Sequence, residues 1–330
     1  MVLVTGGTGF LGSILIRQLI DSGVAVRAIK RPSSRVPTPL DSHPRLQWVN
    51  ADINDFFALE EAFEGVTEVY HCAALISFHP ADRSQLHKVN VEGTAHVVTL
   101  ALDHGIRLLH VSSVAALGRS KAGVAITEED LWEYSHHESG YAVAKYESEQ
   151  EVWRGIAEGL DAVIVNPALI IGASASDAGN GSTGTLFAKL RKGMDFYVTG
   201  SVGLIDVQDA AKAMILLMNN KAISGERFVL SNVNMPTREL LEKCSNYLGR
   251  KAPRFRATPF MLSVASRVTQ GYGWLTGKRT ALTRELARSA SSSGQYSNEK
   301  VRQVIGMDFR PIEDTLREIC TTLSTNTNRK

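Results

Sequence analysis

Cysteine, net charge and long apolar runs are all scarce in this chain of 330 residues. Its three cysteines, Cys72, Cys244 and Cys320, are isolated and lack metal-site spacing. This argues against a disulfide framework and favours a reduced compartment. Lysine and arginine number 36 against 34 aspartates and glutamates, so the bulk charge indicates no nucleic-acid partner. No apolar run reaches transmembrane length, and the first expected strand begins at residue 2. We therefore expect a cytoplasmic protein without a transmembrane segment or signal peptide.

Motifs for hydrolysis and for metal binding are also missing. The sequence has no G-x-S-x-G elbow, the turn that presents the nucleophile of many hydrolases. Four scattered histidines, at positions 71, 79, 87 and 110, have no metal spacing. Two of them, His71 and His110, fall inside expected strands, where packing is their ordinary role. We predict no metal site.

The first dozen residues carry the strongest positive signal. An apolar run over residues 2–5 leads directly into Gly6-Gly7-Thr8-Gly9-Phe10-Leu11-Gly12, followed by an expected helix over 13–22 and a strand over 24–29. This strand–turn–helix–strand order is typical of a dinucleotide-binding unit, whose glycines allow a sharp turn and close approach of backbone N–H groups to a pyrophosphate. The pyrophosphate would lie at the helix N-terminus. By themselves the glycines fit either G-x-G-x-x-G from Gly7 or G-x-x-G-x-x-G from Gly6.

Strands and helices alternate at least five times up to residue 167, and several strands are continuously apolar. This pattern predicts an α/β fold with a Rossmann-type doubly wound parallel sheet, whose ligand crevice lies at the carboxyl ends of the strands. Strands are also expected over 202–206 and 226–230, and the sheet is expected to regain one element in this region; from residue 232 onward we expect helices. We assign 1–171 and 204–231 to the dinucleotide-binding domain, and 172–203 and 232–330 to a smaller, mainly helical substrate-binding cap.

The pair Tyr141 and Lys145 lies one helical turn apart in an expected helix. A nearby ammonium group and an oxidised nicotinamide favour the phenolate, which suits the tyrosine to proton exchange with a carbonyl or hydroxyl oxygen. Ser113 follows an expected strand and could hold that oxygen, although Ser112 is chemically equivalent. The same spacing at Tyr247…Lys251 and Tyr296…Lys300 lies outside such a helix. For those two pairs we expect solvated surface residues.

The end of the second strand bears on the choice of cofactor. No acid that could bind the adenosine ribose hydroxyls of NAD occurs there, and the basic residues are Arg27, Lys30, Arg31 and Arg35. A guanidinium suits a 2′-phosphate. We therefore predict NADP in preference to NAD, with Arg31 at the phosphate; the alternative is a solvated basic loop. The second glycine run, over 179–184, does not directly follow a strand, and we expect a flexible loop.

Taken together, these motifs resemble the extended short-chain dehydrogenase/reductase family, also called NAD-dependent epimerase/dehydratase. The resemblance selects the Gly6, Gly9 and Gly12 register and favours Ser113 over Ser112. It implies catalytic roles for Ser113, Tyr141, Lys145 and Asn90, the last by positioning a water. The cofactor contacts that it implies are Gly6, Thr8, Gly9, Phe10, Leu11, Gly12, Asp52, Ile53, Ala73, Ala74, Ser112, Tyr141, Lys145, Pro167 and Ala168.

Within the family, residues 111–118 and the basic second-strand end look most like the dihydroflavonol-4-reductase and 3β-hydroxysteroid-dehydrogenase branch. The function we expect is an NADP(H)-dependent interconversion of a ketone and a secondary alcohol on a small, hydrophobic substrate. A nucleotide-sugar epimerase or dehydratase with tightly bound NAD(P) is the alternative, and a cofactor-binding regulator is a third hypothesis. The apolar stretch 259–275 suits a substrate lid, ordinary domain packing or membrane contact. The resemblance also implies a homodimer through the helices expected at 82–104 and 140–158.

Overall fold

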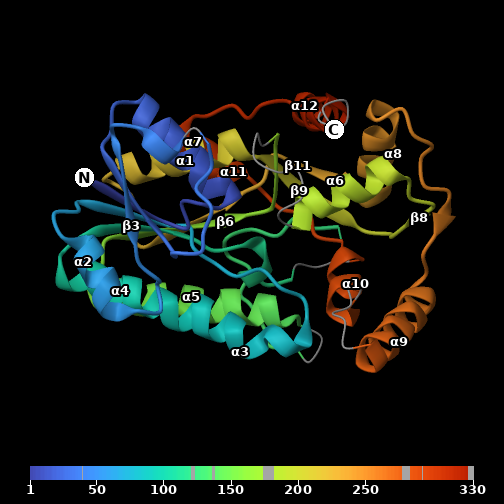
Figure 1. The fold of residues 1–330 in the computed structure, drawn as a ribbon, viewed down its shortest axis with the longest axis horizontal. Coiled ribbons are helices and arrows are strands. Elements are labelled where there is room, and N and C mark those ends of the chain that lie inside the picture. Colours follow the sequence, from blue (N-terminus) through green and yellow to red (C-terminus); the bar gives the residue numbers. More distant parts are fainter. Residues whose placement is uncertain are drawn as a thin grey trace.

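The fold was obtained as a computed structural model, which describes residues 1–38, 40–119, 123–135, 138–173, 182–276, 283–291 and 293–325. A seven-stranded parallel sheet forms its centre, in the order β10-β6-β5-β4-β1-β2-β3 (Figure 1). Its strands are β1 Val2–Thr5, β2 Val26–Lys30, β3 Leu46–Asn50, β4 Glu68–His71, β5 Arg107–Val111, β6 Ala162–Pro167 and β10 Glu226–Leu230. Every residue of β1 and β6 is buried, as the apolar runs predicted.

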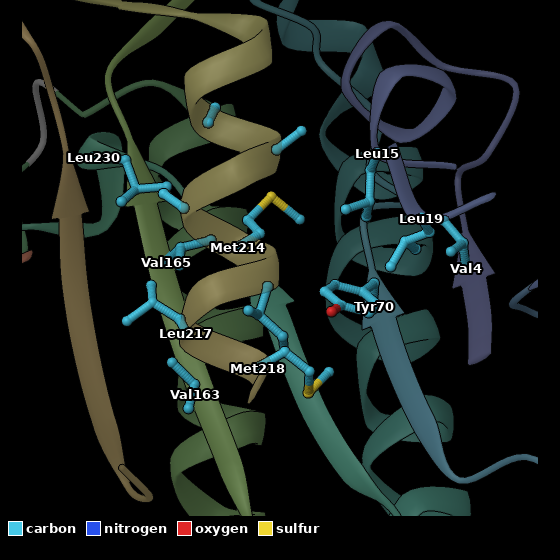
Figure 2. Packing of buried hydrophobic residues seen from close by; sticks show 14 of the residues in the cluster. Val4, Leu15, Leu19, Tyr70, Val163, Val165, Met214, Leu217, Met218 and Leu230 are labelled. Atoms are coloured by element: carbon cyan, nitrogen blue, oxygen red, sulfur yellow. The ribbon is translucent and has the colours of Figure 1, made fainter. Parts of the chain in front are cut away.

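Helices cover both faces of this sheet, which confirms the doubly wound fold. On one face lie α1 Phe10–Asp21, α7 Val207–Asn219 and α11 Glu299–Ile305, and on the other α2 Phe56–Phe63, α4 Gly93–Asp103 and α5 Gly140–Ala157 (Figure 1). Figure 2 shows the core of the first face, where Leu15 and Leu19 of α1 and Met214 of α7 lie in one buried cluster with the sheet residue Val165. A second cluster holds the other helices to the opposite face. The glycine turn is thus anchored between a buried strand and a buried helix.

A second part of the molecule lies beside the sheet and mixes short strands with helices. Its strands are β7 Leu169–Ile171, β8 Phe196–Tyr197, β9 Ser201–Asp206, β11 Val233–Pro236 and β12 Phe255–Arg256; its helices are α6 Ser182–Lys192, α8 Thr237–Tyr247, α9 Pro259–Thr276, α10 Arg284–Ala290 and α12 Ile312–Thr325. The prediction of helices alone after residue 232 is wrong, because β11 pairs with β9 and β12 with β8. These short strands depend on distant partners, so no local periodicity marks them.

The helix expected over 82–104 is interrupted. It consists of η2 Pro80–Asp82, α3 Arg83–Leu86, a π-helical segment η3 His87–Glu92, and then α4. Within this stretch the Thr94 hydroxyl donates to the carbonyl oxygen of Asn90 at 2.5 Å, and the Asn90 side chain bonds the loop after β4. Such π-helical turns are frequent at functional sites. No helix among the described residues is long and apolar enough to cross a membrane.

Candidate active site

The glycine turn after β1 is packed too closely for side chains at two positions. Gly6 has φ +69°, and a Cβ on it would lie 2.6 Å from the backbone nitrogen of Ala73. A Cβ on Gly12 would overlap the carbonyl oxygen of Gly6, whereas one on Gly9 would lie 3.1 Å from the same oxygen. Gly6 lets the chain turn beside β4, and Gly12 brings α1 against the turn. Gly9 and Gly12 belong to both registers, so Gly6 and Gly7 decide between them. A Cβ on Gly7 would meet the flexible end of the Ile16 side chain at 2.6 Å, whereas Gly6 has a positive φ and backbone against it, which favours the register of Gly6, Gly9 and Gly12.

The N-terminus of α1 fits a diphosphate. Gly9 is its N-cap, and no side chain caps the helix, so the first N–H groups, from Phe10 onward, point out of the helix end as donors. Thr8 is half-buried in the turn, and Leu11 packs against the first core cluster. The helix dipole favours an anion at this position. The turn therefore has the shape and the donors that a dinucleotide pyrophosphate needs.

The basic residues around β2 are not equivalent. Arg27 donates to the carbonyl oxygens of Ala62 and Glu64, at 2.9 and 2.7 Å, and so is committed to the fold. Lys30 donates to Asn50 Oδ1 at 2.8 Å. Arg31 is the first residue after β2 and is exposed. Of these three, Arg31 is the one best placed to meet a ligand phosphate.

Asp52 and Ile53 follow β3. The Asp52 Oδ1 atom accepts hydrogen bonds from the backbone and side-chain nitrogens of Asn54, at 3.0 and 2.9 Å. Ile53 is buried, and its side chain lies so close to Gly93 that a Cβ there would be 2.7 Å away. Asp52 shapes its own loop, and Ile53 joins that loop to α4. Their expected adenine contacts stay predictions.

A buried network joins the ends of β1 and β4. His71 Nδ1 lies 2.7 Å from Thr5 Oγ1 and His71 Nε2 lies 3.0 Å from Thr94 Oγ1. Because Thr94 already donates to a carbonyl, it accepts from His71, which assigns a neutral imidazole protonated at Nε2. Burial, and secondly the charge of Lys145, lower the pKa of His71 to about 3. Thr5 Oγ1 in turn accepts from the backbone nitrogen of Ala73 at 3.1 Å, and Ala74 beyond it is exposed.

Asn90 lies in the π-helical segment with 1% of its surface exposed. Its Oδ1 atom accepts from the Leu75 backbone nitrogen at 2.7 Å, and its Nδ2 atom donates to the Leu75 carbonyl at 3.0 Å. The side chain therefore fixes the loop that follows β4. The expected positioning of a water by Asn90 stays a prediction.

The two serines after β5 have different surroundings. The Ser112 hydroxyl is buried and donates to Glu149 Oε2 at 2.6 Å. The Ser113 hydroxyl instead lies close enough to the phenol of Tyr141 to act on its pKa, and it accepts from the backbone nitrogen of Ala115 at 3.1 Å. The chemistry of the residues left the two serines equivalent, and the fold separates them. Ser113 is the serine beside the tyrosine.

Tyr141 and Lys145 both lie on α5, beside the end of β5. Burial raises the pKa of Tyr141, and the hydrogen bond with Ser113 acts to lower it. Lys145 Nζ donates to the carbonyl oxygen of Val111 at 2.8 Å. Burial lowers the pKa of Lys145 to about 8, against the opposing charge of Glu149. In this structure Lys145 does not act on the pKa of Tyr141, and its ammonium group bonds the strand. The lowering that we predicted beside an oxidised nicotinamide stays a prediction.

Glu149 is a charged residue of this site that the motif reasoning missed. It is 1% exposed and lies one turn beyond Lys145 on α5. Its carboxylate accepts from Ser112, from Asn166 Nδ2 at 2.8 Å and from Arg227 Nη1 at 3.3 Å. Asn166 Nδ2 also donates to the carbonyl oxygen of Ser113 at 3.0 Å. The spacing of positions 141, 145 and 149 along one helix face was the available signal.

Helix α10 closes one side of the site. Glu285 accepts a hydrogen bond from the Gly140 backbone nitrogen at 2.9 Å and pairs with Arg83 at 2.6 Å. Thr283 donates to the carbonyl oxygen of Phe78 at 2.7 Å, and the Phe78 ring lies 5.6 Å from that of Tyr141. The carboxyl end of β6 supplies the buried residues Pro167 and Ala168. The C-terminal part of the chain, which we assigned to the cap, thus reaches the tyrosine.

The other two tyrosine–lysine pairs lie away from this constellation. The Arg317 guanidinium packs 5.6 Å from the centre of the Tyr247 ring, and Lys300 pairs with Glu226 at 2.9 Å. Lys300 is therefore an ion-pair partner and not the solvated lysine that we expected. Half of the second glycine run, residues 179–181, lies outside the described residues, and the other half, 182–184, begins α6, so the expected loop is wrong for those three residues. Within the part of the chain that the structure describes, no histidine, cysteine and carboxylate residues cluster as metal ligands.

Comparison with known proteins finds one family along most of the chain. The NAD dependent epimerase/dehydratase family matches residues 2–231. A putative dihydroflavonol 4-reductase of Synechocystis sp. is 31% identical over 96% of this chain and 92% of its own length. Sterol demethylase protein B of Methylococcus capsulatus is 33% identical over 79% and 78%. Among solved structures, gox2253 superposes with a TM-score of 0.83 at 28% identity over 99% of this chain and 98% of its own.

Proposed function

Because this chain belongs to the NAD dependent epimerase/dehydratase family and its relatives include reductases, we propose that it is an NADP(H)-dependent ketone reductase or alcohol dehydrogenase. The observation that carries the proposal is that α5 brings Tyr141 and the buried Lys145 to the carboxyl end of β5, beside Ser113. A phenol and a hydroxyl converge there beside the buried Lys145, at the edge of the sheet that also holds the glycine turn. A protein that only senses a nucleotide needs the turn and not this set.

When bound, the nicotinamide supplies a hydride to the carbonyl carbon. Tyr141 then donates its phenolic proton to the carbonyl oxygen, and Ser113 holds that oxygen by a hydrogen bond. Lys145 would bind the nicotinamide ribose in place of its bond to the Val111 carbonyl. Asn90 keeps the loop after β4 in place and is proposed to supply protons through a water. In the oxidising direction the same residues act in reverse.

The cofactor residues that we propose follow the carboxyl ends of the strands. The turn with Gly6, Gly9 and Gly12 would hold the pyrophosphate at the α1 N-terminus. Arg31, exposed after β2, would pair with a 2′-phosphate, which supports NADP over NAD. The remaining proposed contacts are Thr8, Phe10, Leu11, Asp52, Ile53, Ala73, Ala74, Ser112, Pro167 and Ala168.

We propose a small, hydrophobic substrate. Phe78 lies against Tyr141 and comes from a loop that α10 holds in place, so an apolar ring borders the reacting oxygen. The names of the relatives agree, since they include a dihydroflavonol 4-reductase, a sterol demethylase protein and cinnamoyl-CoA reductases. Aromatic and steroid ketones are therefore the first compounds to test.

The decisive experiment measures NADPH absorbance with a panel of aromatic and steroid ketones, and separately with UDP-sugars. We expect net NADPH consumption with at least one ketone, tighter binding of NADPH than of NADH, and loss of that preference in Arg31→Asp. An exposed arginine away from the site, Arg302→Asp, is the control. Cofactor that co-purifies with the protein, together with UDP-sugar conversion without net NADPH use, would overturn the proposal in favour of an epimerase or dehydratase.

A further inference from the structure

Helix α9 carries large apolar side chains on its outer face. Phe260 is 74% exposed and Val268 65%, and Met261 and Val264 are also exposed. We call these four residues the apolar stripe; their spacing places them on one side of the helix. Ser266, on the opposite side, is fully buried. Over residues 260–269, whose side chains the structure describes, four large apolar residues thus face outward.

The stripe is continuous. Together with Ala265 and Thr269, its four members line one shallow apolar hollow on the surface. Helix α9 lies beyond α10 at the lower right edge of Figure 1. Exposed apolar residues that gather in this way mark a surface that another body covers.

The chain around α9 is strongly basic, although the whole protein is nearly neutral. Residues 248–284 hold eight lysines and arginines and no aspartate or glutamate. Six of these cations are described and exposed: Arg250, Lys251, Arg254, Arg256, Arg267 and Arg284. Two acids border the stretch: Glu285 is paired with Arg83, and the exposed Asp195 lies beside Arg254. The cations still outnumber them, so the body that covers the stripe is expected to be negatively charged.

Strand β12 adds an aromatic residue between two of these cations. Phe255 is 60% exposed and stands between Arg254 and Arg256. Its ring lies 5.7 Å from that of Phe196, which is 48% exposed. In Figure 1 this segment follows the right-hand edge of the molecule down to α9. Exposed aromatic rings beside arginines suit the boundary between lipid headgroups and acyl chains.

We propose that the apolar stripe and the cations around it bind the surface of an anionic lipid bilayer. The stripe would enter the acyl boundary, and the arginines and lysines would meet lipid phosphates. A second copy of this chain fits less well, because the same cations surround its stripe and the two positively charged surfaces would repel each other. An enzyme held this way would meet a hydrophobic substrate where such a compound accumulates. The binding itself does not depend on the proposed reaction.

The test is co-sedimentation of the full chain with large unilamellar vesicles. One set contains phosphatidylglycerol mixed with phosphatidylcholine, and the other phosphatidylcholine alone. We expect binding to the first set only, weakened by added salt. Val264→Asp with Val268→Asp should reduce binding about tenfold or more, since it places two charges in the stripe. Arg254→Glu with Arg256→Glu should reduce it without touching the helix.

The matched control is Phe57→Asp, which changes a 77% exposed phenylalanine on α2, at the opposite side of the molecule (Figure 1). This variant should bind as the wild type does, and circular dichroism should show all variants folded. Failure of the wild type to bind anionic vesicles would overturn the proposal, and so would unchanged binding in both double variants. A dimer in light scattering that Val264→Asp with Val268→Asp converts to a monomer would also overturn it, in favour of a second copy.

Discussion

Helices α5 and α9 both have 18 residues, but they place opposite chemistry inside and outside. Helix α5 buries charge: Lys145 and Glu149 are 2% and 1% exposed. Helix α9 exposes apolar residues, with Phe260 at 74%. A buried charge needs partners and costs free energy, so it persists where the site requires it. An exposed apolar stripe likewise indicates a use beyond folding. Both helices deviate from ordinary patterning where we propose that the protein acts.

A valine-to-aspartate substitution should lower the free energy of unfolding much more on α5 than on α9. Val152 is fully buried in the cluster behind the sheet. Val152→Asp would place an unpaired carboxylate there, which should cost more than about 4 kcal/mol of unfolding free energy. Urea unfolding measures the loss. If the variant cannot be recovered folded, Val152→Thr should still cost about 1–2 kcal/mol; a cost near zero for Val152→Thr would contradict the packing described here.

Removing one oxygen from α5 tests the proposed chemistry. Tyr141→Phe should lower turnover about 1000-fold, because it deletes the proton donor, while the dissociation constant for NADPH stays nearly unchanged. Steady-state kinetics and a binding titration measure the two quantities. The control is Tyr247→Phe, at the last residue of α8, in a tyrosine–lysine pair of equal spacing. Turnover retained in Tyr141→Phe would refute the assignment of Tyr141.

Glu149 provides the test of buried charge. Glu149→Ala leaves Arg227, Ser112 and Asn166 without their common acceptor and should cost about 3 kcal/mol of unfolding free energy. Glu149→Gln should cost less and should move the pKa of Lys145 further down, because the carboxylate charge raises it. Because Lys145 would then lose its proton at a lower pH, the alkaline limb of kcat/KM for reduction should shift to lower pH.

A matched control lies on the same helix. Glu151 forms a partly exposed pair with Arg154, so Glu151→Gln should change stability by less than about 0.5 kcal/mol. An unshifted pH profile in Glu149→Gln would limit Glu149 to a purely structural role.

Lys145 should make stability depend on pH. Burial lowers its pKa from 10.5 to about 8, so between these values the unfolded chain binds more protons than the folded one. The free energy of unfolding attributable to Lys145 therefore rises with pH in this window, by up to about 1.4 kcal/mol per unit. Urea unfolding at several pH values should show this as a difference between wild type and Lys145→Met, which cancels the titration of other groups. Equal slopes in the two proteins would contradict the buried ammonium.

The smallest effect is expected on α9. Val268→Asp should change the free energy of unfolding by less than about 0.5 kcal/mol, because the side chain is 65% exposed. The difference between the stability losses in Val152→Asp and Val268→Asp measures the contrast between a buried and an exposed valine on helices of equal length. A large loss of stability in Val268→Asp would show that the stripe packs within the protein, and the contrast between the helices would disappear.

The amino-acid sequence alone determined the architecture and the positions of the proposed catalytic residues along it. Buried parallel strands need apolar runs, and a turn against a strand needs glycine, so residues 2–12 and the alternating pattern carried this information locally. The chemistry of a tyrosine and a lysine one helical turn apart is local as well. These features could be predicted because neighbours along the chain create them.

Only the tertiary structure decided how distant residues meet. It turned Ser112 toward Glu149 and Ser113 toward Tyr141, and it directed the Lys145 ammonium to the Val111 carbonyl. It also paired β12 with β8, and it exposed one side of α9 while burying Ser266 on the other. Each outcome depends on contacts between segments far apart in the chain, which no window of neighbouring residues contains. A serine's partner and a helix's outer face are therefore set by packing and not by local propensity.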